Sequence, residues 1–182
     1  YIITNFSKKF SYNSLKKFIN INSSNTIKKY IDYLSQTHLI SLINKYDTSL
    51  KKQLINDKKA YILDNGFIHF VSKKSTKDKG WLLENLIYNY ISNKKDVFYL
   101  SNGFECDFIQ LIDKHIFQVT YELNDENKKR EINGLINAMK YLKTNSGYIL
   151  TYDQEDTLSI NNNKINIIPV WKFLLKNDII VN

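Results

Sequence analysis

The order of apolar, periodic segments in the second part of the chain is the sequence feature that most constrains its fold. Residues 81–91 carry apolar side chains at helical spacing just after Gly80, and residues 125–142 repeat that spacing. Strand-like segments lie between and after these helices, at 97–100, 104–112, 115–121, 147–151 and 165–168. The first three predict an antiparallel meander, because short turn signals separate them. The resulting order, αβββαβ, predicts an α/β sandwich of helices on a sheet.

The first part of the chain shows two short helical patterns in place of this alternation. A helix beginning near 11–14 is predicted from apolar residues three and four positions apart, Leu15, Phe18 and Ile19. The next helix is capped by Ser23 or Ser24, and its apolar positions are Ile27, Tyr30, Ile31 and Leu34. The polar stretch between them predicts a turn, so the layout is helix-turn-helix.

A strand pair follows these helices. Residues 39–46 alternate and are β-branched, residues 47–56 are polar and carry lysines, and residues 60–63 return as a strand. Two helices followed by such a hairpin predict a winged helix. We therefore divide the chain into a winged-helix domain over 1–75 and an α/β domain over 76–182, in a protein that is α+β overall.

Charge is distributed unevenly between these two parts. Residues 1–75 hold 13 lysines and four aspartates, a net charge of +9, whereas residues 76–182 hold 13 basic and 14 acidic residues, a net charge of −1. A localised basic excess is expected of a surface that binds phosphates, so DNA is the predicted partner. The predicted contacts lie on the second helix and the hairpin: Asn25, Lys28, Lys29, Lys51, Lys52, Lys58 and Lys59.

The chemistry of these contacts limits what they can recognise. Lysines bind phosphate and give a salt-dependent affinity that is neutral to sequence, while Asn25 is the obvious base reader. The alternative is that this part packs against another domain and its lysines are only solvated.

Composition also excludes several classes of protein. No apolar run approaches the roughly 20 residues of a membrane-spanning helix and no signal peptide is present, which predicts a cytoplasmic protein without a membrane partner. No GxxxxGK[ST] loop occurs, so the chain has no ATP site of that kind. Cys106 cannot form an internal disulfide or share a zinc site with the scattered His38, His69 and His115, and we interpret it as a small buried strand residue.

Strand alternation brings a small set of oxygen-bearing side chains to one place. Glu105 and Asp107 share one face of their strand, and Gln118 and Thr120 share a face of the next. With aligned register, Asp107, Gln118 and the helix residue Glu84 can converge and hold a divalent cation through oxygen atoms. Such a metal could activate water against a phosphodiester.

At these residues the chain resembles the PD-(D/E)XK nuclease motif, with strand-borne Asp107 followed by Gln118-Val119-Thr120. The resemblance implies that Asp107 and Gln118 bind magnesium. Thr120 occupies the position of the motif lysine and brings no positive charge to stabilise a developing anion, so catalysis is expected to be weak or silent. The neutral Gln118 would also hold magnesium more weakly than a carboxylate.

A longer string of segments resembles the C-terminal region of prokaryotic AAA+-type ATPases that carry a winged helix and a restriction-endonuclease-like domain. These segments are TIKKYIDYL, YILDNGF, GWLLENLIYNYI, FECDFI, FQVTYEL, the pair Arg130-Glu131, and IIPVWKFLL. The resemblance implies an ATPase domain of the same polypeptide, N-terminal to this chain, where ATP would bind. The start at Tyr1 rather than methionine fits a piece of a longer protein.

These observations lead to functions of different classes. The leading prediction is a DNA-binding and regulatory module of an ATPase, with a nuclease-like domain that is degenerate at Thr120. The alternatives are a magnesium-dependent deoxyribonuclease and a module that binds a protein partner. Each site residue also has a structural alternative: Glu84 as the polar edge of a helix, Asp107 as the marker of a strand edge, and Gln118 as a partner of buried backbone.

Overall fold

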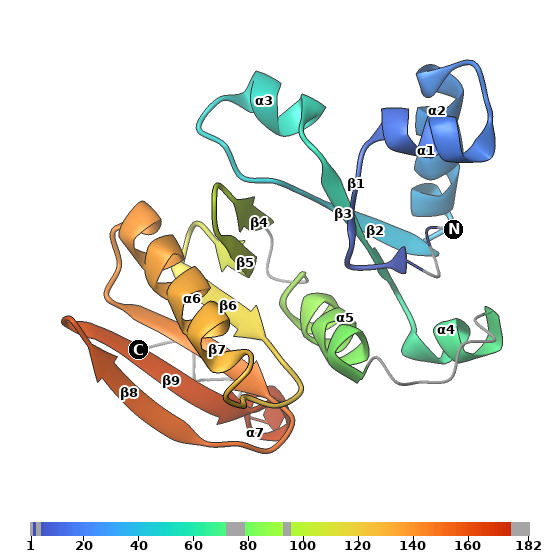
Figure 1. Cartoon of the computed structure of the whole chain (residues 1–182). Coiled ribbons are helices and arrows are strands. Elements are labelled where there is room, and N and C mark those ends of the chain that lie inside the picture. Colours follow the sequence, from blue (N-terminus) through green and yellow to red (C-terminus); the bar gives the residue numbers. More distant parts are fainter. Residues whose placement is uncertain (1, 3–4, 72–78, 93–95, 176–182) are drawn as a thin grey trace. The chain divides into compact units, whose positions relative to one another are not determined.

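The computed structural model describes residues 2, 5–71, 79–92 and 96–175 (Figure 1). Its internal contacts divide the chain into two compact units, Tyr1–Lys77 and Asp78–Asn182. Both units contain helices and strands, and the larger sheet mixes parallel and antiparallel pairs. The predicted α/β class is thus confirmed at the level of a mixed α+β protein. Within the described residues, none of the helices has the length and apolar character needed to span a membrane.

The first unit combines short helices with a small antiparallel sheet. Its elements are β1 (Lys9–Phe10), α1 (Tyr12–Ile19), α2 (Ser24–Gln36), β2 (Ile40–Asn44), α3 (Leu50–Ile55), β3 (Lys58–Ile62) and α4 (Asn65–Val71). The strands lie in the order β1-β3-β2, so β3 is paired on both sides. Its core is made of side chains from α1, α2 and the sheet: Phe10, Leu15, Ile27, Ile31, Ile40 and Ala60.

Serine caps fix the starts of α1 and α2, and the cap of α2 by Ser23 confirms the prediction. Ser11 forms a reciprocal capping box with Ser14, and Ser23 accepts a hydrogen bond from the backbone N–H of Thr26. The expected inward positions of Phe18 and Ile19 are wrong, because these side chains are 67% and 49% exposed. The chain turns away in a left-handed conformation at Asn20, directly after α1, so the last turn of this short helix stays largely exposed.

The polar segment expected to be a loop of the hairpin contains helix α3. Ser49 caps it by accepting from the Lys52 N–H, and Asp47 accepts from the Ser49 N–H at 2.9 Å. None of the residues of α3 is buried. The apolar spacing from which helices are inferred reports a buried face, and α3 has no such face.

The second unit is built on a six-stranded sheet. Its elements are α5 (Lys79–Ser92), β4 (Val97–Ser101), β5 (Glu105–Gln110), β6 (His115–Val119), α6 (Lys128–Leu142), β7 (Ser146–Thr151), β8 (Asp156–Ile160), β9 (Asn163–Pro169) and α7 (Val170–Leu175). The strand order is β4-β5-β6-β7-β9-β8. The antiparallel meander of β4, β5 and β6 confirms the prediction, and β6-β7 and β7-β9 are parallel.

Strand β8 was not predicted. It forms a hairpin with β9 across a turn at Asn161 and Asn162, both of which have positive φ. Such φ values suit a tight hairpin turn, in which asparagine is well tolerated. Strand β8 has no buried residue, so its sequence lacks the alternation of apolar and polar residues from which strands are predicted.

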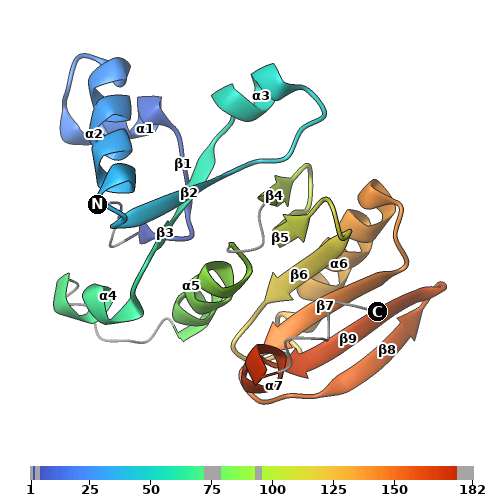
Figure 2. The same ribbon diagram turned by 180° about the vertical axis from the view of Figure 1, so that it is seen from behind.

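Helices cover both faces of this sheet. Helix α6 lies across β6 and β7 on one face (Figure 1), and α7 lies on the other, seen from behind in Figure 2. Ring contacts assign α5 to the face of α7: Tyr88 packs on Phe108 at 6.1 Å and Phe173 packs on Phe117 at 5.6 Å. The sheet side chains adjacent in sequence to Phe108 and Phe117 therefore face α6. Cys106 is buried in β5, as predicted.

Candidate functional site

The first unit exposes lysines on α2 and α3. Asn25, Lys28 and Lys29 are exposed in the first two turns of α2, and Lys51 and Lys52 are exposed on α3. These five predicted DNA contacts are therefore available to a partner. We call these five residues the basic surface.

The other two lysines predicted to contact phosphate do not belong to this surface. Lys58 is 8% exposed and Lys59 is 3% exposed. The prediction is wrong because both residues lie on β3, the central strand of the sheet, where every residue is buried. A phosphate group could not reach Lys59 without displacing its neighbours.

Lys58 has a structural role that the sequence did not reveal. Its ammonium donates to the carbonyl oxygens of Leu54 at 3.1 Å and Asn56 at 3.4 Å, and to Asn44 Oδ1 at 3.0 Å. Carbonyl groups at the end of a helix have no partner within it and carry partial negative charge, so a cation there stabilises the helix. Lys58 therefore fastens the end of α3 to the sheet.

The pKa of Lys58 is shifted by burial and by charges on other parts of the first unit. Burial lowers the pKa of Lys58 below its ordinary value of 10.5, and the positive charge of Lys28 lowers it further, while Asp57 acts in the opposite direction. The charge of Lys28 on α2 thus acts on the group that is hydrogen-bonded to the end of α3.

In the second unit, Asp107 and Gln118 meet where β5 and β6 separate. Main-chain pairing between these strands ends at Phe108 and Phe117, although β6 continues to pair with β7 through Val119. Beyond that point Asp107 Oδ2 accepts from the Val119 N–H at 3.0 Å, and Gln118 Oε1 accepts from the Asp107 N–H at 3.3 Å. The two side chains thus replace the missing rungs of the ladder.

Glu131 on α6 completes this arrangement, and the sequence reasoning did not include it in the site. Gln118 Nε2 donates to Glu131 Oε2 at 2.5 Å, and Arg130 Nη2 donates to Glu131 Oε1 at 2.6 Å. Glu131 is 3% exposed, so its charge needs these partners. No local pattern in the sequence singles out Glu131, because its place in the cluster depends on the packing of α6 against β5 at Gly134.

The charges around Arg130 confirm that these groups form one cluster. The hydrogen bond from Arg130 to Glu131 raises the pKa of the guanidinium, and the charge of Glu131 adds to this effect. Burial opposes it, and the carboxylates of Asp107 and Glu105 raise the pKa further. We call Asp107, Gln118, Glu131 and Arg130 the polar cluster.

Thr120 lies beside the polar cluster and is used by the loop that leads to α6. Its backbone N–H donates to Leu150 O at 3.0 Å, so it extends the pairing of β6 with β7. Its hydroxyl donates to Glu122 O at 3.1 Å and accepts from Asn127 Nδ2 at 3.3 Å. The residue in the motif-lysine position therefore orders a turn.

Glu84 lies on the helix that covers the other face of the sheet. It is buried on α5, one turn before Tyr88, and α5 covers the face opposite to α6. The structure thus brings Asp107 and Gln118 together, while Glu84 belongs to the helix on the opposite face of the sheet.

Hydrogen bonds already engage the oxygen atoms of Asp107 and Gln118 that the resemblance assigns to magnesium. The amide of Gln118 is engaged at both ends, by the Asp107 N–H and by Glu131, and one oxygen of Asp107 already accepts from Val119. In the described part of the chain, no three or more His, Cys, Asp and Glu side chains form a group that could hold a metal ion. The cluster is thus a hydrogen-bonded network that joins α6, β5 and β6.

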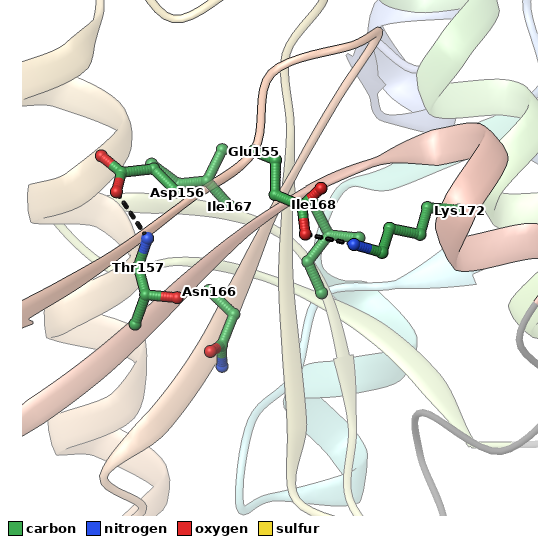
Figure 3. Close-up of a pocket in the computed structure, with 7 residues that line it drawn as sticks. All are labelled: Glu155, Asp156, Thr157, Asn166, Ile167, Ile168 and Lys172. Carbon is green, nitrogen blue, oxygen red and sulfur yellow. Dashed lines mark hydrogen bonds and ion pairs between the residues drawn. The ribbon is translucent and has the colours of Figure 1, made fainter.

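A separate pocket of about 220 Å³ lies between β8, β9 and α7 (Figure 3). The ion pair of Glu155 with Lys172 crosses it, and Asp156 accepts from the Thr157 N–H at 2.7 Å. Glu155, Lys172 and Asp156 thus already have partners within the protein. The arrangement offers no set of convergent groups that would select a ligand.

Comparisons with known proteins extend across both units. Residues 1–78 match the family model described as a domain of unknown function, DUF8612. The chain is 34% identical over 176 residues to an uncharacterized protein of Methanocaldococcus jannaschii, in an alignment that covers 90% of this chain. The same alignment covers 39% of that protein, so the chain spans well under half the length of this relative. No solved structure matches the chain.

Proposed function

We propose that the chain is a DNA-binding module of a larger protein, in which the first unit acts as a winged helix and the second as a nuclease-like domain without cleavage activity. The observation that carries the proposal is the exposure of Lys28 and Lys29 on α2 and of Lys51 and Lys52 on α3. The first part of the chain also holds the whole excess of positive charge. Duplex DNA is the polyanion that such a helix and hairpin fit best.

The test is a titration of fluorescent duplex DNA with the whole chain at several salt concentrations. We expect affinity to fall steeply with salt, and Lys28→Glu with Lys29→Glu to weaken binding to all sequences alike. Lys140→Glu with Lys143→Glu is the control, because it changes the total charge equally in the second unit and should leave affinity within about twofold. Equal losses in both double variants would show that only net charge matters and would overturn the proposal.

The proposed silence of the nuclease-like domain is supported by the polar cluster. Gln118 is held between the Asp107 N–H and Glu131, and Thr120 orders a loop without supplying a charge. Lack of the lysine alone commonly costs about 10²-fold or more in rate. Incubation of the chain with duplex and single-stranded DNA in magnesium or manganese should leave the DNA intact.

A magnesium-dependent deoxyribonuclease is the second candidate, and one observation favours it. Asp107 and Gln118 lie together where two strands separate, which is the positional relationship expected of the motif residues. Cleavage by the unchanged chain that Asp107→Ala abolishes would make this the preferred function. If the unchanged chain does not cleave DNA but the geometry of a nuclease site survives, Thr120→Lys combined with Gln118→Glu would restore slow cleavage.

The larger protein is proposed to be an AAA+-type ATPase, with this chain as its C-terminal region. Support comes from the resemblance of the sequence segments and from a relative of which this chain spans only 39%. In the whole natural protein we expect duplex DNA to alter ATP hydrolysis, and Lys28→Glu with Lys29→Glu to remove that effect. Hydrolysis that is unaffected by DNA would contradict a regulatory role.

A further inference from the structure

Helix α3 exposes three large aliphatic side chains on one short element. Leu50 is 75% exposed, Leu54 is 71% exposed and Ile55 is 72% exposed. None of the six residues of α3 is buried, so burial of apolar surface does not hold this helix in place. A helix of this length does not form in water on its own, because the first turn is costly to nucleate. Its conformation must come from other contacts.

Polar contacts at both ends of α3 and at Gln53 hold this helix in place. Ser49 caps its first turn, Gln53 Nε2 donates to Asp47 O at 2.5 Å, and Lys58 binds the carbonyl groups at its end. Gln53 projects on the side of the helix opposite to the arc that contains Leu54, Lys51 and Ile55, because successive residues turn by about 100°. The polar anchors thus fix α3 and present its aliphatic side chains outward.

The charges around these side chains indicate what covers them. Lys51 and Lys52 interleave with the aliphatic residues, and both lysines are exposed. A second copy of this unit would bring like charges together, whereas a polyanion would be attracted. Apolar side chains that enter the minor groove of a duplex, with cationic side chains on the flanking phosphates, are a known mode of DNA contact.

We propose that Leu50, Leu54 and Ile55 of α3 form an apolar DNA contact, which seats against sugars and base edges while Lys51 and Lys52 bind the adjacent phosphates. This inference rests on the proposed function and adds to it a contact that is not electrostatic. The two kinds of contact differ in one measurable property. Loss of a lysine reduces the dependence of binding on salt, and loss of an aliphatic side chain lowers affinity at every salt concentration without changing that dependence.

The experiment compares the unchanged chain with Leu54→Gln combined with Ile55→Gln. We expect the double variant to bind duplex DNA about tenfold more weakly, with an unchanged slope of log affinity against log salt, as for two partly buried side chains. Leu63→Gln is the matched control, because Leu63 is 65% exposed and follows the opposite end of β3 from Lys58. Thermal melts of all three proteins check that exposed substitutions leave the fold intact.

Each outcome decides between the two proposals. Failure of the unchanged chain to bind duplex would overturn the proposed function and this inference together. Normal binding by both the chain and the double variant would overturn the inference alone and leave the DNA-binding function standing. The same proteins are also mixed with vesicles of phosphatidylcholine and phosphatidylserine. Vesicle binding that only the double variant loses, with duplex binding unchanged, would identify α3 as a membrane contact and overturn the inference.

Discussion

Gln118 and Glu131 are joined by a hydrogen bond of 2.5 Å between a strand and a helix, and this bond links the β5-β6 junction to α6. Both residues are buried, and Gln118 is bound at its other end by the Asp107 N–H. The cluster that looks like a nuclease motif in the sequence therefore has a clear structural role. That role can be separated from catalysis by measuring stability.

Replacement of Glu131 should destabilise the second unit. Glu131→Ala leaves the buried Gln118 amide without its acceptor, and we expect the free energy of unfolding to fall by about 2–3 kcal/mol. Glu126→Ala, at an exposed position just before α6, should change it by less than about 0.5 kcal/mol. Urea unfolding of the whole chain measures both. Equal stability of the two variants would contradict the role assigned to Glu131.

Two glycines in helices should respond in opposite directions to the same change. A Cβ atom at Gly134 would collide with the carbonyl oxygen of Glu105 on β5, so Gly134→Ala must push α6 from the sheet and should cost about 1–3 kcal/mol. A Cβ atom at Gly80 meets nothing within 4 Å, so Gly80→Ala should be neutral or add up to about 1 kcal/mol. Chemical denaturation compares them. A stabilising Gly134→Ala would contradict the close packing of α6.

Removal of the charge on Lys28 should change the titration of Lys58. The charge of Lys28 lowers the pKa of Lys58, so Lys28→Gln should raise that pKa toward 10.5. Lys29→Gln is the control, with a smaller effect expected. NMR titration of the Lys58 side chain provides the measurement. Identical shifts in the two variants would contradict the specific effect of Lys28 on Lys58.

The same lowered pKa has a consequence for stability. Between the folded-state pKa of Lys58 and its ordinary value of 10.5, the unfolded chain binds more protons than the folded chain. The contribution of this group to the free energy of unfolding therefore rises as pH increases through that window. In Lys28→Gln the window should narrow and its lower limit should move to higher pH, which unfolding curves recorded over this range would detect.

Loss of the Lys58 ammonium should loosen α3 while the sheet persists. Lys58→Met keeps the aliphatic chain of the side chain but cannot donate to Leu54 O and Asn56 O. We expect amide hydrogens of residues 50–55 to exchange faster, because few other contacts hold this helix. Lys51→Met, which replaces an exposed lysine of α3, serves as the control. Unchanged exchange in Lys58→Met would show that the caps at the start of α3 suffice.

Much of the second unit could be predicted because its elements bury one face. The meander of β4, β5 and β6, the helix α6 and the strand β7 all carry apolar residues at the period of their structure. Elements without a buried face were missed. Helix α3 and strand β8 carry their apolar or alternating positions on exposed surface, so neither gives the expected signal.

The candidate sites were predicted only in part, for a similar reason. Alternation along a strand places Asp107 and Gln118 on one face, and the structure brings them together. The addition of Glu131 depends on how closely α6 approaches β5 at Gly134, which a single sequence does not encode in any local pattern. Likewise, Lys58 and Lys59 look like other surface lysines until β3 is known to be the central strand.

The sequence by itself determined the mixed α+β class, the cap of α2, the meander, and the concentration of positive charge in the first part of the chain. These features follow from local spacing and composition, since each depends on residues within a few positions of one another. Only the tertiary structure decided which lysines are available to a partner, that α3 stands outward on polar anchors, and that Gln118 is bound to Glu131. Burial and hydrogen bonding between distant segments depend on which surfaces meet when the chain packs, and no local pattern carries that information.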